Sequence, residues 1–372
     1  MRIGVLTTSY PRWSGDPAGA FVAELSRLFA ATGDEVVVVA AGPGGDRDPF
    51  DRRIRVTRVQ GRGLFYRGGA PEALAARGGT VRAVAFSADL FRAARNAFAS
   101  ADALVSHWLV PSGLVGAALA RGRPHVAIGH GSDVHLLATR RGGAAALAWV
   151  CRRSRVVVSS AAGRARLSAI WPAAASLSVC PMGLDVASLA GARLDRAAAR
   201  TSLGIPLCAF VVAFLGRLVA IKGLEVLQAA LPAGATLLVA GDGPERPRLV
   251  AGPGRFLGEV DAAGRRQLLA AADVLAVPSR RLADGRTEGA PLVVLEGLAA
   301  GVPVVASDSG GIPELVGDAA LVVPAGDVAA LAAALVRIRD DAALAGRLAR
   351  RGAARVIELD WPRVAGRIRG WL

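Results

Sequence analysis

The sequence predicts an α/β protein with two domains, each built on a parallel sheet. Short β-branched runs alternate with longer segments rich in Ala, Leu and Arg, which is the rhythm of parallel strands joined by helices. This rhythm runs through the first half of the chain and starts again near residue 210. The length of 372 residues suits two domains of about 150 to 200 residues better than a single core.

The predicted strands fall into two series. They are residues 2–7, 35–41, 103–106, 125–129, 155–159 and 177–180 in the first series, and 210–216, 235–240, 255–258, 273–277, 302–306 and 320–323 in the second. The segment 21–29 places Phe21, Leu25 and Phe29 on one helical face, so we expect a helix after the first strand.

The segment Pro181-Met-Gly-Leu-Asp185 lies between the two series, and its Pro and Gly suit a hinge. We therefore expect two facing Rossmann-like domains, at residues 1–182 and 183–357. Ligands of open α/β sheets bind beyond the carboxyl ends of the strands, so the cleft between the domains is the expected site. Residues from about 358 to 372 predict a final helix, opened by Asp360 with Pro362 in its first turn, that packs on a neighbouring domain.

The basic charge is concentrated in the first half of the chain. Residues 1–182 contain 23 arginines and 11 acidic residues, a net charge of +12, and the remainder carries +3. Much of the excess falls in the Gly-rich and Arg-rich stretch 47–82, which we interpret as a loop. Two interpretations stay open: a solvated surface, or a surface that faces anionic lipid headgroups or a phosphorylated acceptor.

The composition also bears on location and on class of partner. No apolar stretch approaches the roughly 18 residues that span a bilayer, and the first residues form a strand-like run rather than the basic-then-apolar order of a signal peptide. We expect a cytoplasmic protein, with peripheral contact at the inner membrane face as an open alternative. Nucleic acid is disfavoured, because aromatic residues are only 5% and the charge lies in a loop-like stretch.

The only lysine of the chain, Lys222, stands in a candidate phosphate-binding turn. It follows the first strand of the second series in Phe214-Leu-Gly-Arg-Leu-Val-Ala-Ile-Lys-Gly223, the position of a phosphate loop in such sheets. Arg217 can grip phosphate oxygens bidentately, while Lys222 adds a compact charge on a flexible stem. The pair suits a diphosphate. The alternative is a surface lysine beside an ordinary glycine turn.

Glu288 and Glu296 flank the apolar run Gly-Ala-Pro-Leu-Val-Val-Leu. If a helix begins near Pro291, Glu288 lies in the preceding loop and Glu296 on the first turns. Carboxylates there can accept hydrogen bonds from sugar and ribose hydroxyls. The alternative, two glutamates on a solvated helix, conflicts with the apolar run between them. The turn 307–314 ends another predicted strand and should face the same cleft.

His130 is the candidate site residue of the first domain. It stands in Gly129-His-Gly-Ser-Asp133 after an apolar strand, and its glycine neighbours permit close approach of backbone to a ligand. A lone histidine is otherwise more often structural. The segment Gly15-Asp-Pro-Ala-Gly19, after the first strand, is a second place where backbone can meet a ligand.

Several other chemistries lack their motifs. No G-x-G-x-x-G follows either first strand, Lys222 is followed by Gly rather than Ser or Thr, and neither G-x-S-x-G nor H-E-x-x-H occurs. The three cysteines lie far apart without a C-x-x-C pair, so we expect small buried hydrophobes rather than a disulfide or zinc site. Asp46-Arg-Asp48 lies in the basic loop, and we discount it as a metal pair.

Taken together and in this order, the motifs resemble the retaining glycosyltransferases of family GT4, which have the GT-B fold. The resemblance covers nearly the whole chain. Besides the segments above it includes Gly241-Asp-Gly-Pro244 and Gly310-Gly-Ile-Pro-Glu314, and the terminal Trp361 segment resembles the crossover helix that packs on the first domain. Met182 departs from the asparagine usual in the linker, and the loop 279–287 carries extra arginines.

The resemblance implies a metal-independent enzyme without a cofactor that moves a sugar from a nucleotide diphosphate sugar to a glycan, lipid-linked or small-molecule acceptor, in polysaccharide, glycolipid or other glycoconjugate biosynthesis. The catalytic residues it implies are His130, Arg217, Lys222 and Glu288; the donor-binding residues are Gly19, Gly216, Arg217, Lys222, Gly241, Gly289, Ala290, Pro291, Leu292 and Glu296; and Asp16 and Asp133 lie on the acceptor side. Two alternatives remain: a GT-B epimerase or hydrolase of sugar nucleotides, and a non-catalytic basic binding module.

Overall fold

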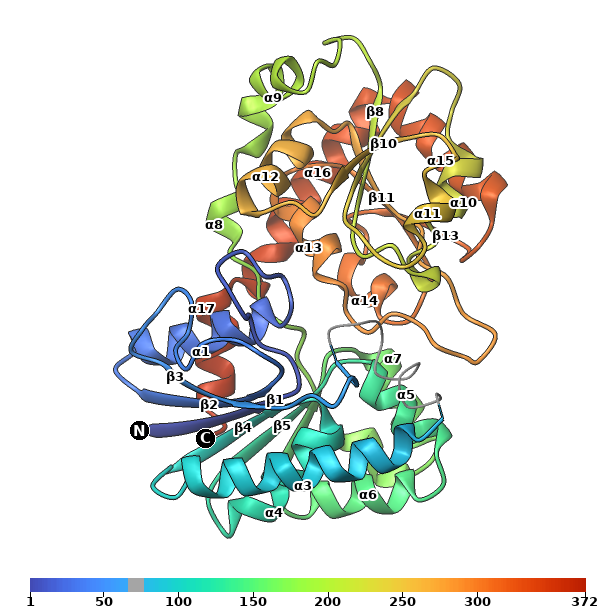
Figure 1. Ribbon diagram of the computed structural model, residues 1–372. Coiled ribbons are helices and arrows are strands. Elements are labelled where there is room, and N and C mark those ends of the chain that lie inside the picture. Colours follow the sequence, from blue (N-terminus) through green and yellow to red (C-terminus); the bar gives the residue numbers. More distant parts are fainter. Residues whose placement is uncertain (66–76) are drawn as a thin grey trace. The chain divides into compact units, whose positions relative to one another are not determined.

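The computed structural model describes residues 1–65 and 77–372, which form two compact units (Figure 1). The first unit comprises Met1–Gly183 together with Trp361–Leu372, and the second comprises Leu184–Asp360. Within the described residues, no helix is long and apolar enough to cross a membrane.

The first unit is built on a seven-stranded sheet in which every neighbouring pair is parallel. The strand order is β3-β2-β1-β4-β5-β6-β7. The strands are β1 Arg2–Thr7, β2 Glu35–Ala41, β3 Arg55–Val59, β4 Ala103–His107, β5 His125–Gly129, β6 Arg155–Val158 and β7 Ser178–Val179. The helices are α1 Ala20–Ala31, α3 Gly79–Ala97, α4 Leu114–Ala120, α5 Ser132–Thr139, α6 Gly143–Cys151, α7 Ala161–Ser168 and α17 Trp361–Arg369.

The C-terminal helix α17 packs beside α1 in the first unit (Figure 1). Its apolar side is buried, including Trp361 and Ile368. The Arg369 guanidinium donates to the Asp34 carboxylate at 2.7 Å. Position 183 has room only for glycine, because a Cβ there would lie 2.4 Å from the Trp361 ring. The last helix is thus held in the first unit by packing and by the ion pair between Arg369 and Asp34.

The second unit repeats the architecture with six parallel strands in the order β10-β9-β8-β11-β12-β13. The strands are β8 Val211–Leu215, β9 Thr236–Ala240, β10 Arg255–Gly258, β11 Val274–Val277, β12 Val304–Ser307 and β13 Leu321–Val323. The helices are α8 Val186–Leu189, α9 Arg196–Ser202, α10 Leu224–Ala230, α11 Arg246–Leu249, α12 Ala262–Ala271, α13 Leu292–Ala299, α14 Ile312–Val316, α15 Val328–Asp340 and α16 Ala342–Val356.

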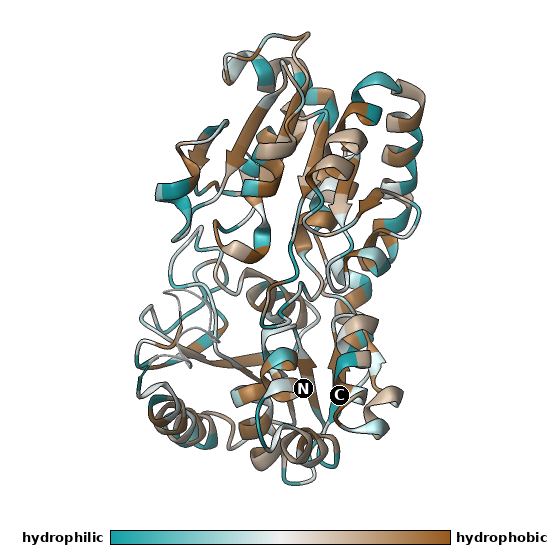
Figure 2. Cartoon of the chain, turned by 90° about the vertical axis from the view of Figure 1, so that its right-hand side faces the viewer, coloured by the Kyte–Doolittle hydropathy of each residue, from teal (hydrophilic) through white to brown (hydrophobic). Residues whose placement is uncertain are grey.

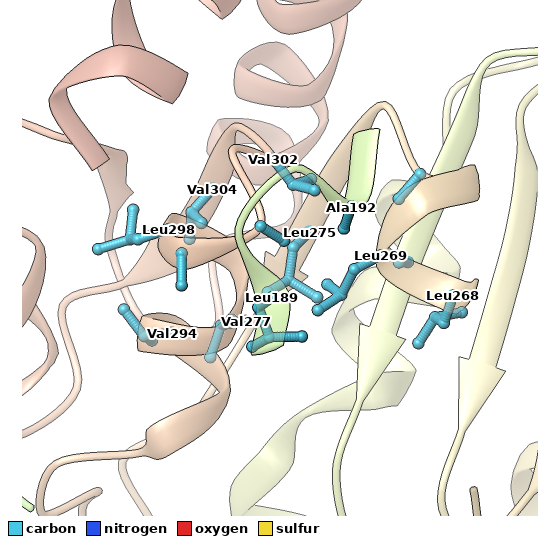
Figure 3. Close-up of a cluster of buried hydrophobic side chains, with 14 of the residues drawn as sticks. Leu189, Ala192, Leu268, Leu269, Leu275, Val277, Val294, Leu298, Val302 and Val304 are labelled. Atoms are coloured by element: carbon cyan, nitrogen blue, oxygen red, sulfur yellow. The ribbon is translucent and has the colours of Figure 1, made fainter. Parts of the chain in front are cut away.

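Both faces of the second sheet are buried. Successive side chains of a strand point to opposite faces, so alternate residues of β8 belong to different apolar clusters. Val211 and Ala213 belong to one apolar cluster, and Val212 and Phe214 belong to another. Figure 3 shows the first cluster, where side chains of α12 and α13 meet those of β11 and β12. The strands are accordingly apolar along their length, as their colour in Figure 2 shows.

The order of the strands reverses at one point in each sheet. This point lies between β1 and β4 in the first unit and between β8 and β11 in the second. At such a point the loops that follow two adjacent strands diverge to opposite faces and leave a crevice at the carboxyl edge, where ligands of open α/β sheets bind.

Two expectations from the sequence are wrong in detail. The stretch 47–82 is not simply a loop, since it contains β3 and the start of α3; only Val56 and Val59 of β3 are buried, so the strand carries too weak an apolar pattern to be recognised between arginines. Residues 66–76 of this stretch lie outside the described residues. Cys208 is exposed rather than buried.

Candidate active site

The second unit places a cation and a carboxylate together at its switch point. Lys222 stands in the loop after β8, and Glu288 stands in the loop between β11 and α13. Lys222 Nζ lies 2.8 Å from Glu288 Oε1, and the two side chains are only 21% and 11% exposed. The Ser279 hydroxyl donates to the same Oε1 at 3.1 Å. Oε2 of Glu288 has no bonding partner in the parts of the chain that the structure describes.

At three glycines, the backbones of the loops around Lys222 and Glu288 contact one another directly. A Cβ added to Gly241 would lie 1.9 Å from the carbonyl oxygen of Gly216. A Cβ on Gly223 would lie 2.1 Å from that of Pro278, and one on Gly310 would lie 1.8 Å from that of Glu288. All three glycines also have positive φ, at 134°, 65° and 60°, where other residues are strained. The loops after β8, β9, β11 and β12 are therefore held together by contacts that only glycine permits.

Arg217 lies on the same loop as Lys222, five residues earlier. Its side chain is exposed, and none of the described residues forms an ion pair with it. The neighbouring backbone is fixed, since Leu218 N donates to Asp242 O at 2.8 Å. The loop after β8 therefore carries two positive charges: one is half-buried and paired with Glu288, and the other is exposed.

Helix α13 begins immediately after the predicted ligand segment. Residues Gly289 and Ala290 are half-buried and lead into Pro291, which precedes the first helical residue Leu292. The amino end of a helix carries partial positive charge and suits anionic groups. Glu296, one turn further along, is buried, and its Oε1 accepts from Arg265 at 2.7 Å.

In the first unit, His130 follows β5, the strand next to β4 at the switch point, and lies in a cluster of rings. Phe21 of α1 and Trp108 lie with their ring centroids 4.9 and 5.0 Å from that of His130. His107, the last residue of β4, has its Nδ1 3.1 Å from His130 Nε2, and the planes of the two rings are nearly parallel, at 7°. Trp108 has a φ of 67°, a strained conformation of the kind that collects at functional sites.

Burial keeps this histidine pair uncharged near neutral pH. It lowers the pKa of His130 to about 4, against an opposing effect of the Asp133 carboxylate. Burial and the neighbouring His130 hold the pKa of His107 well below its usual range. His107 is fully buried, and its Nε2 has no hydrogen-bond partner in the described part of the chain.

The two acidic residues predicted on the acceptor side hold loops. Asp133 accepts from the backbone amides of Leu109, His130 and Gly131 at 2.6, 3.0 and 2.9 Å. Asp16 accepts from the Arg12 side chain at 2.6 Å and from the Ala18 amide at 3.1 Å. Both carboxylates are buried, so their visible contacts position the backbone next to α5 and before α1.

Gly19 occupies a position that no other residue fits. Its φ is 69°, and a Cβ there would lie 2.2 Å from the Ser9 carbonyl oxygen. The segment that precedes α1 therefore packs directly against the backbone after β1. This close contact lies at the carboxyl edge of the first sheet, near its switch point.

Sequence reasoning missed the partners of the site residues. Ser279, Arg265 and His107 fix Glu288, Glu296 and His130 respectively. A weak signal existed for His107 and Ser279, because each stands at or just after the carboxyl end of a predicted strand. Arg265 lies in the interior of α12 and carries no local signal. Among the described residues, no group of three or more His, Cys, Asp or Glu could hold a metal ion.

The fold and the site together define a class of protein. Two Rossmann-like units are joined in one chain, and the second offers cations, carboxylates and a helix amino end where nucleotide ligands of such sheets bind. This is the GT-B architecture.

Comparisons with known proteins narrow the class. The family model "Glycosyltransferase Family 4" matches residues 18–188, and "Glycosyl transferases group 1" matches residues 209–341. Glycogen synthase of Mycobacterium tuberculosis strain H37Rv is 30% identical, over 98% of this chain and 92% of the relative. The chain therefore belongs to the group 1, or family 4, glycosyltransferases.

Other relatives match over a shorter part of their length. Phosphatidyl-myo-inositol mannosyltransferase of Mycobacterium leprae is 36% identical over 58% of this chain and 57% of the relative. The chain thus spans little more than half the length of several curated relatives. Among solved structures, sucrose-phosphate synthase of Thermosynechococcus elongatus has a TM-score of 0.79 at 24% identity, covering 100% of this chain and 98% of that one. HepE of Anabaena with UDP-glucose has a TM-score of 0.76 at 20% identity, covering 100% and 99%.

Proposed function

We propose that this protein transfers a glycosyl residue from a nucleotide diphosphate sugar to an acceptor hydroxyl, with retention of anomeric configuration, in the biosynthesis of a polysaccharide, glycolipid or other glycoconjugate. The observation that carries the proposal is the pair Lys222 and Glu288 at the switch point of the second sheet. A structural neighbour whose solved complex contains UDP-glucose supports a donor of this class.

In this mechanism the second unit stabilises the leaving diphosphate. The acceptor oxygen bonds to the anomeric carbon as the bond from that carbon to the β-phosphate oxygen breaks, and the acceptor proton passes to a phosphate oxygen. Negative charge grows on the diphosphate, so Lys222, Arg217 and the amino end of α13 bind it more strongly in the transition state than in the ground state. These cations take the place of a metal ion.

The carboxylates orient the donor. Because Lys222 and Ser279 both bind Oε1 of Glu288, Oε2 is the oxygen that accepts hydrogen bonds from the sugar. Glu296 plays the same role for the ribose, with its Oε1 held by Arg265. Fixed carboxylates of this kind lose little entropy when the donor binds, which favours a single productive orientation.

His130 acts as a neutral hydrogen-bond donor to the transferred sugar. If His107 Nδ1–H donates to His130 Nε2, the proton of His130 must lie on Nδ1. Nε2 of the buried His107, which has no partner among the described residues, is then unprotonated and carries only a lone pair. The opposite arrangement would bury an unpaired N–H. Buried N–H groups without a partner are rarer in proteins than buried acceptors without one, which favours the first arrangement.

The test combines a donor panel with analysis of the product. Thermal-shift screening against nucleotide diphosphates and their sugars identifies the donor, and proton NMR of the transfer reaction reports the anomeric configuration of the product. The proposal predicts an acceptor-dependent product with the donor's configuration. Glu288→Gln should remain folded and lose most of the transfer. A change of the donor without any acceptor would instead indicate hydrolysis or epimerisation, and inverted product would contradict retention.

We also propose contact of the first unit with anionic lipid headgroups. Trp13 and Phe50 are 56% and 54% exposed, and the guanidinium groups of Arg12 and Arg27 lie over their rings at 4.1 and 4.7 Å. Both arginines are also paired with carboxylates, those of Asp16 and Glu24, so they mainly hold the rings in place. Exposed aromatics suit a membrane interface, and the net charge of +12 over residues 1–182 suits anionic headgroups. The protein should co-sediment with vesicles containing phosphatidylglycerol more than with phosphatidylcholine vesicles, and Trp13→Ala should weaken this; equal sedimentation would exclude the contact.

A further inference from the structure

The first unit contains an apolar cavity of about 100 Å³ at the carboxyl edge of its sheet. Residues from the ends of β1, β3 and β4, and from α3 and α5, surround it. The described residues that line it include Leu64, Phe65, Phe86, Trp108, Pro111 and Leu136. Two of the aromatic lining residues, Phe65 and Phe86, pack against each other, with their ring centroids 4.8 Å apart.

This cavity adjoins the His130 cluster. Trp108 lines the cavity and packs against the His130 ring at 5.0 Å. Asp133 also lines it and accepts from the backbone amide of His130. At the rim, Ser132 is exposed to solvent. A group seated in the cavity therefore lies one side chain away from the residue proposed to contact the transferred sugar.

The chemistry of the walls selects an apolar occupant. Most lining side chains are aliphatic or aromatic. The Asp133 carboxylate is already bound to three amides, and the Ser87 hydroxyl donates to Ala83 O at 2.7 Å. Of the other described lining residues, only Thr8 and the rim residue Ser132 carry a side-chain hydroxyl. These are too few partners for the hydroxyls of a sugar ring, whose desolvation would cost several kcal/mol.

The size of the cavity suits a short group. A water molecule occupies about 30 Å³ of liquid, and a cavity of about 150 Å³ holds benzene. A volume of about 100 Å³, in a pocket that is partly open to solvent, thus has room for a few carbon atoms, roughly a propyl or butyl chain.

We propose that this cavity binds a short aliphatic part of the acceptor, adjacent to the hydroxyl that is glycosylated. The inference rests on the proposed function and narrows its acceptor to an amphiphile, either an alkyl-bearing alcohol or a glycoside with an aliphatic aglycone. A free sugar would leave the cavity unused.

The test compares methyl and butyl glycosides of mannose and glucose as ligands, with binding measured by saturation-transfer NMR. Burial of one methylene contributes about fourfold in affinity, so three added methylenes give up to about sixtyfold. Wild-type protein should bind butyl glycosides at least tenfold more tightly than methyl glycosides. Ala83→Leu, which fills the cavity, should reduce this ratio below about threefold.

Two further variants separate the cavity from general effects. Ala88→Leu makes the same substitution at an exposed position of α3 and should keep the wild-type ratio. Leu136→Ala enlarges the cavity and should move the preferred chain from butyl towards hexyl. The inference is overturned if no alkyl glycoside binds, if methyl and butyl glycosides bind wild type equally, or if Ala83→Leu and Ala88→Leu behave alike.

Nucleotide binding by the second unit distinguishes failure of this inference from failure of the proposed function. Titration of UDP and GDP into the same samples uses none of the cavity residues. Diphosphate binding without alkyl discrimination contradicts only the cavity assignment. Absence of diphosphate binding contradicts the proposed function, and alkyl discrimination in that case would still identify the cavity as an apolar site.

Discussion

Replacement of Gly310 by alanine should disrupt the donor site without unfolding the second unit. Gly310 follows β12 and has a φ of 60°. A Cβ there would lie 1.8 Å from the Glu288 carbonyl oxygen and 2.8 Å from its carbonyl carbon. Contacts between backbone and Cβ below 3.0 Å are not tolerated, so the segment containing Glu288 must move by more than about 1 Å.

The expected magnitude has two parts. An alanine in the left-handed conformation costs about 1–2 kcal/mol in folding free energy. Displacement of a positioned group by about 1 Å costs on the order of a hundredfold in activity. Gly301→Ala is the matched control, because Gly301 has a φ of 68° and nothing within 4 Å of its added Cβ.

Urea unfolding measures the first part, and calorimetric titration with the nucleotide diphosphate sugar, together with a transfer assay, measures the second. We expect both variants to lose about 1–2 kcal/mol of stability from the strained backbone, with an additional loss for Gly310→Ala. Only Gly310→Ala should lose nucleotide diphosphate sugar binding and transfer. Wild-type affinity and transfer in a folded Gly310→Ala protein would refute the claim that the loop contact with Glu288 shapes the site.

Three further predictions concern the histidines and metal dependence. In His107→Asn, the side-chain amide can still donate to His130 Nε2, so nitrogen-15 NMR should show the Nδ1–H tautomer of His130 and most of the transfer rate should remain. His107→Leu should lose both this tautomer and the transfer. An unchanged tautomer in His107→Leu would contradict the proposal that His107 sets the tautomer of His130. Burial lowers the pKa of His125 to about 3, so the unfolded chain takes up this proton first as the pH falls below about 6.5. The free energy of unfolding should therefore keep the full contribution of this residue above pH 6.5 and lose it progressively towards pH 3, with about 2 kcal/mol lost at pH 5. Urea unfolding of His125→Gln should show a flatter dependence of this free energy on pH than wild type. The same pH dependence in the two proteins would exclude the effect. Transfer should continue in excess EDTA, and abolition that Mg²⁺ or Mn²⁺ reverses would show that the cations of the second unit do not suffice.

The sequence predicted the parallel sheets well because their central strands are buried on both faces. Runs such as Val36 to Val39 are continuous and apolar, and they differ clearly from the Ala-rich helices around them. By contrast, β3 escaped prediction because an edge strand with two buried valines carries little pattern. Its stabilisation comes from pairing with β2, which no local signal records.

The candidate site was predictable where chemistry and loop position coincide in the sequence. Lys222 and Glu288 stand in the loops that follow β8 and β11, so the topology brings their loops to one edge. The sequence does not show that they form an ion pair, that Arg265 binds Glu296, or that His107 lies within hydrogen-bond distance of His130. These contacts depend on the register between strands and on helix packing, and both are set by tertiary structure.

The role of Lys222 in binding a diphosphate is central, and calorimetric titration of a nucleoside diphosphate and the matching monophosphate into wild type and Lys222→Ala tests it most directly. A hydrogen bond to a charged group contributes about 1.5–3 kcal/mol, so diphosphate affinity should fall by about ten- to a hundredfold in the variant while monophosphate affinity changes little. Equal diphosphate affinity in the two folded proteins, or an equal loss for both nucleotides, would contradict the placement of the leaving group at this lysine.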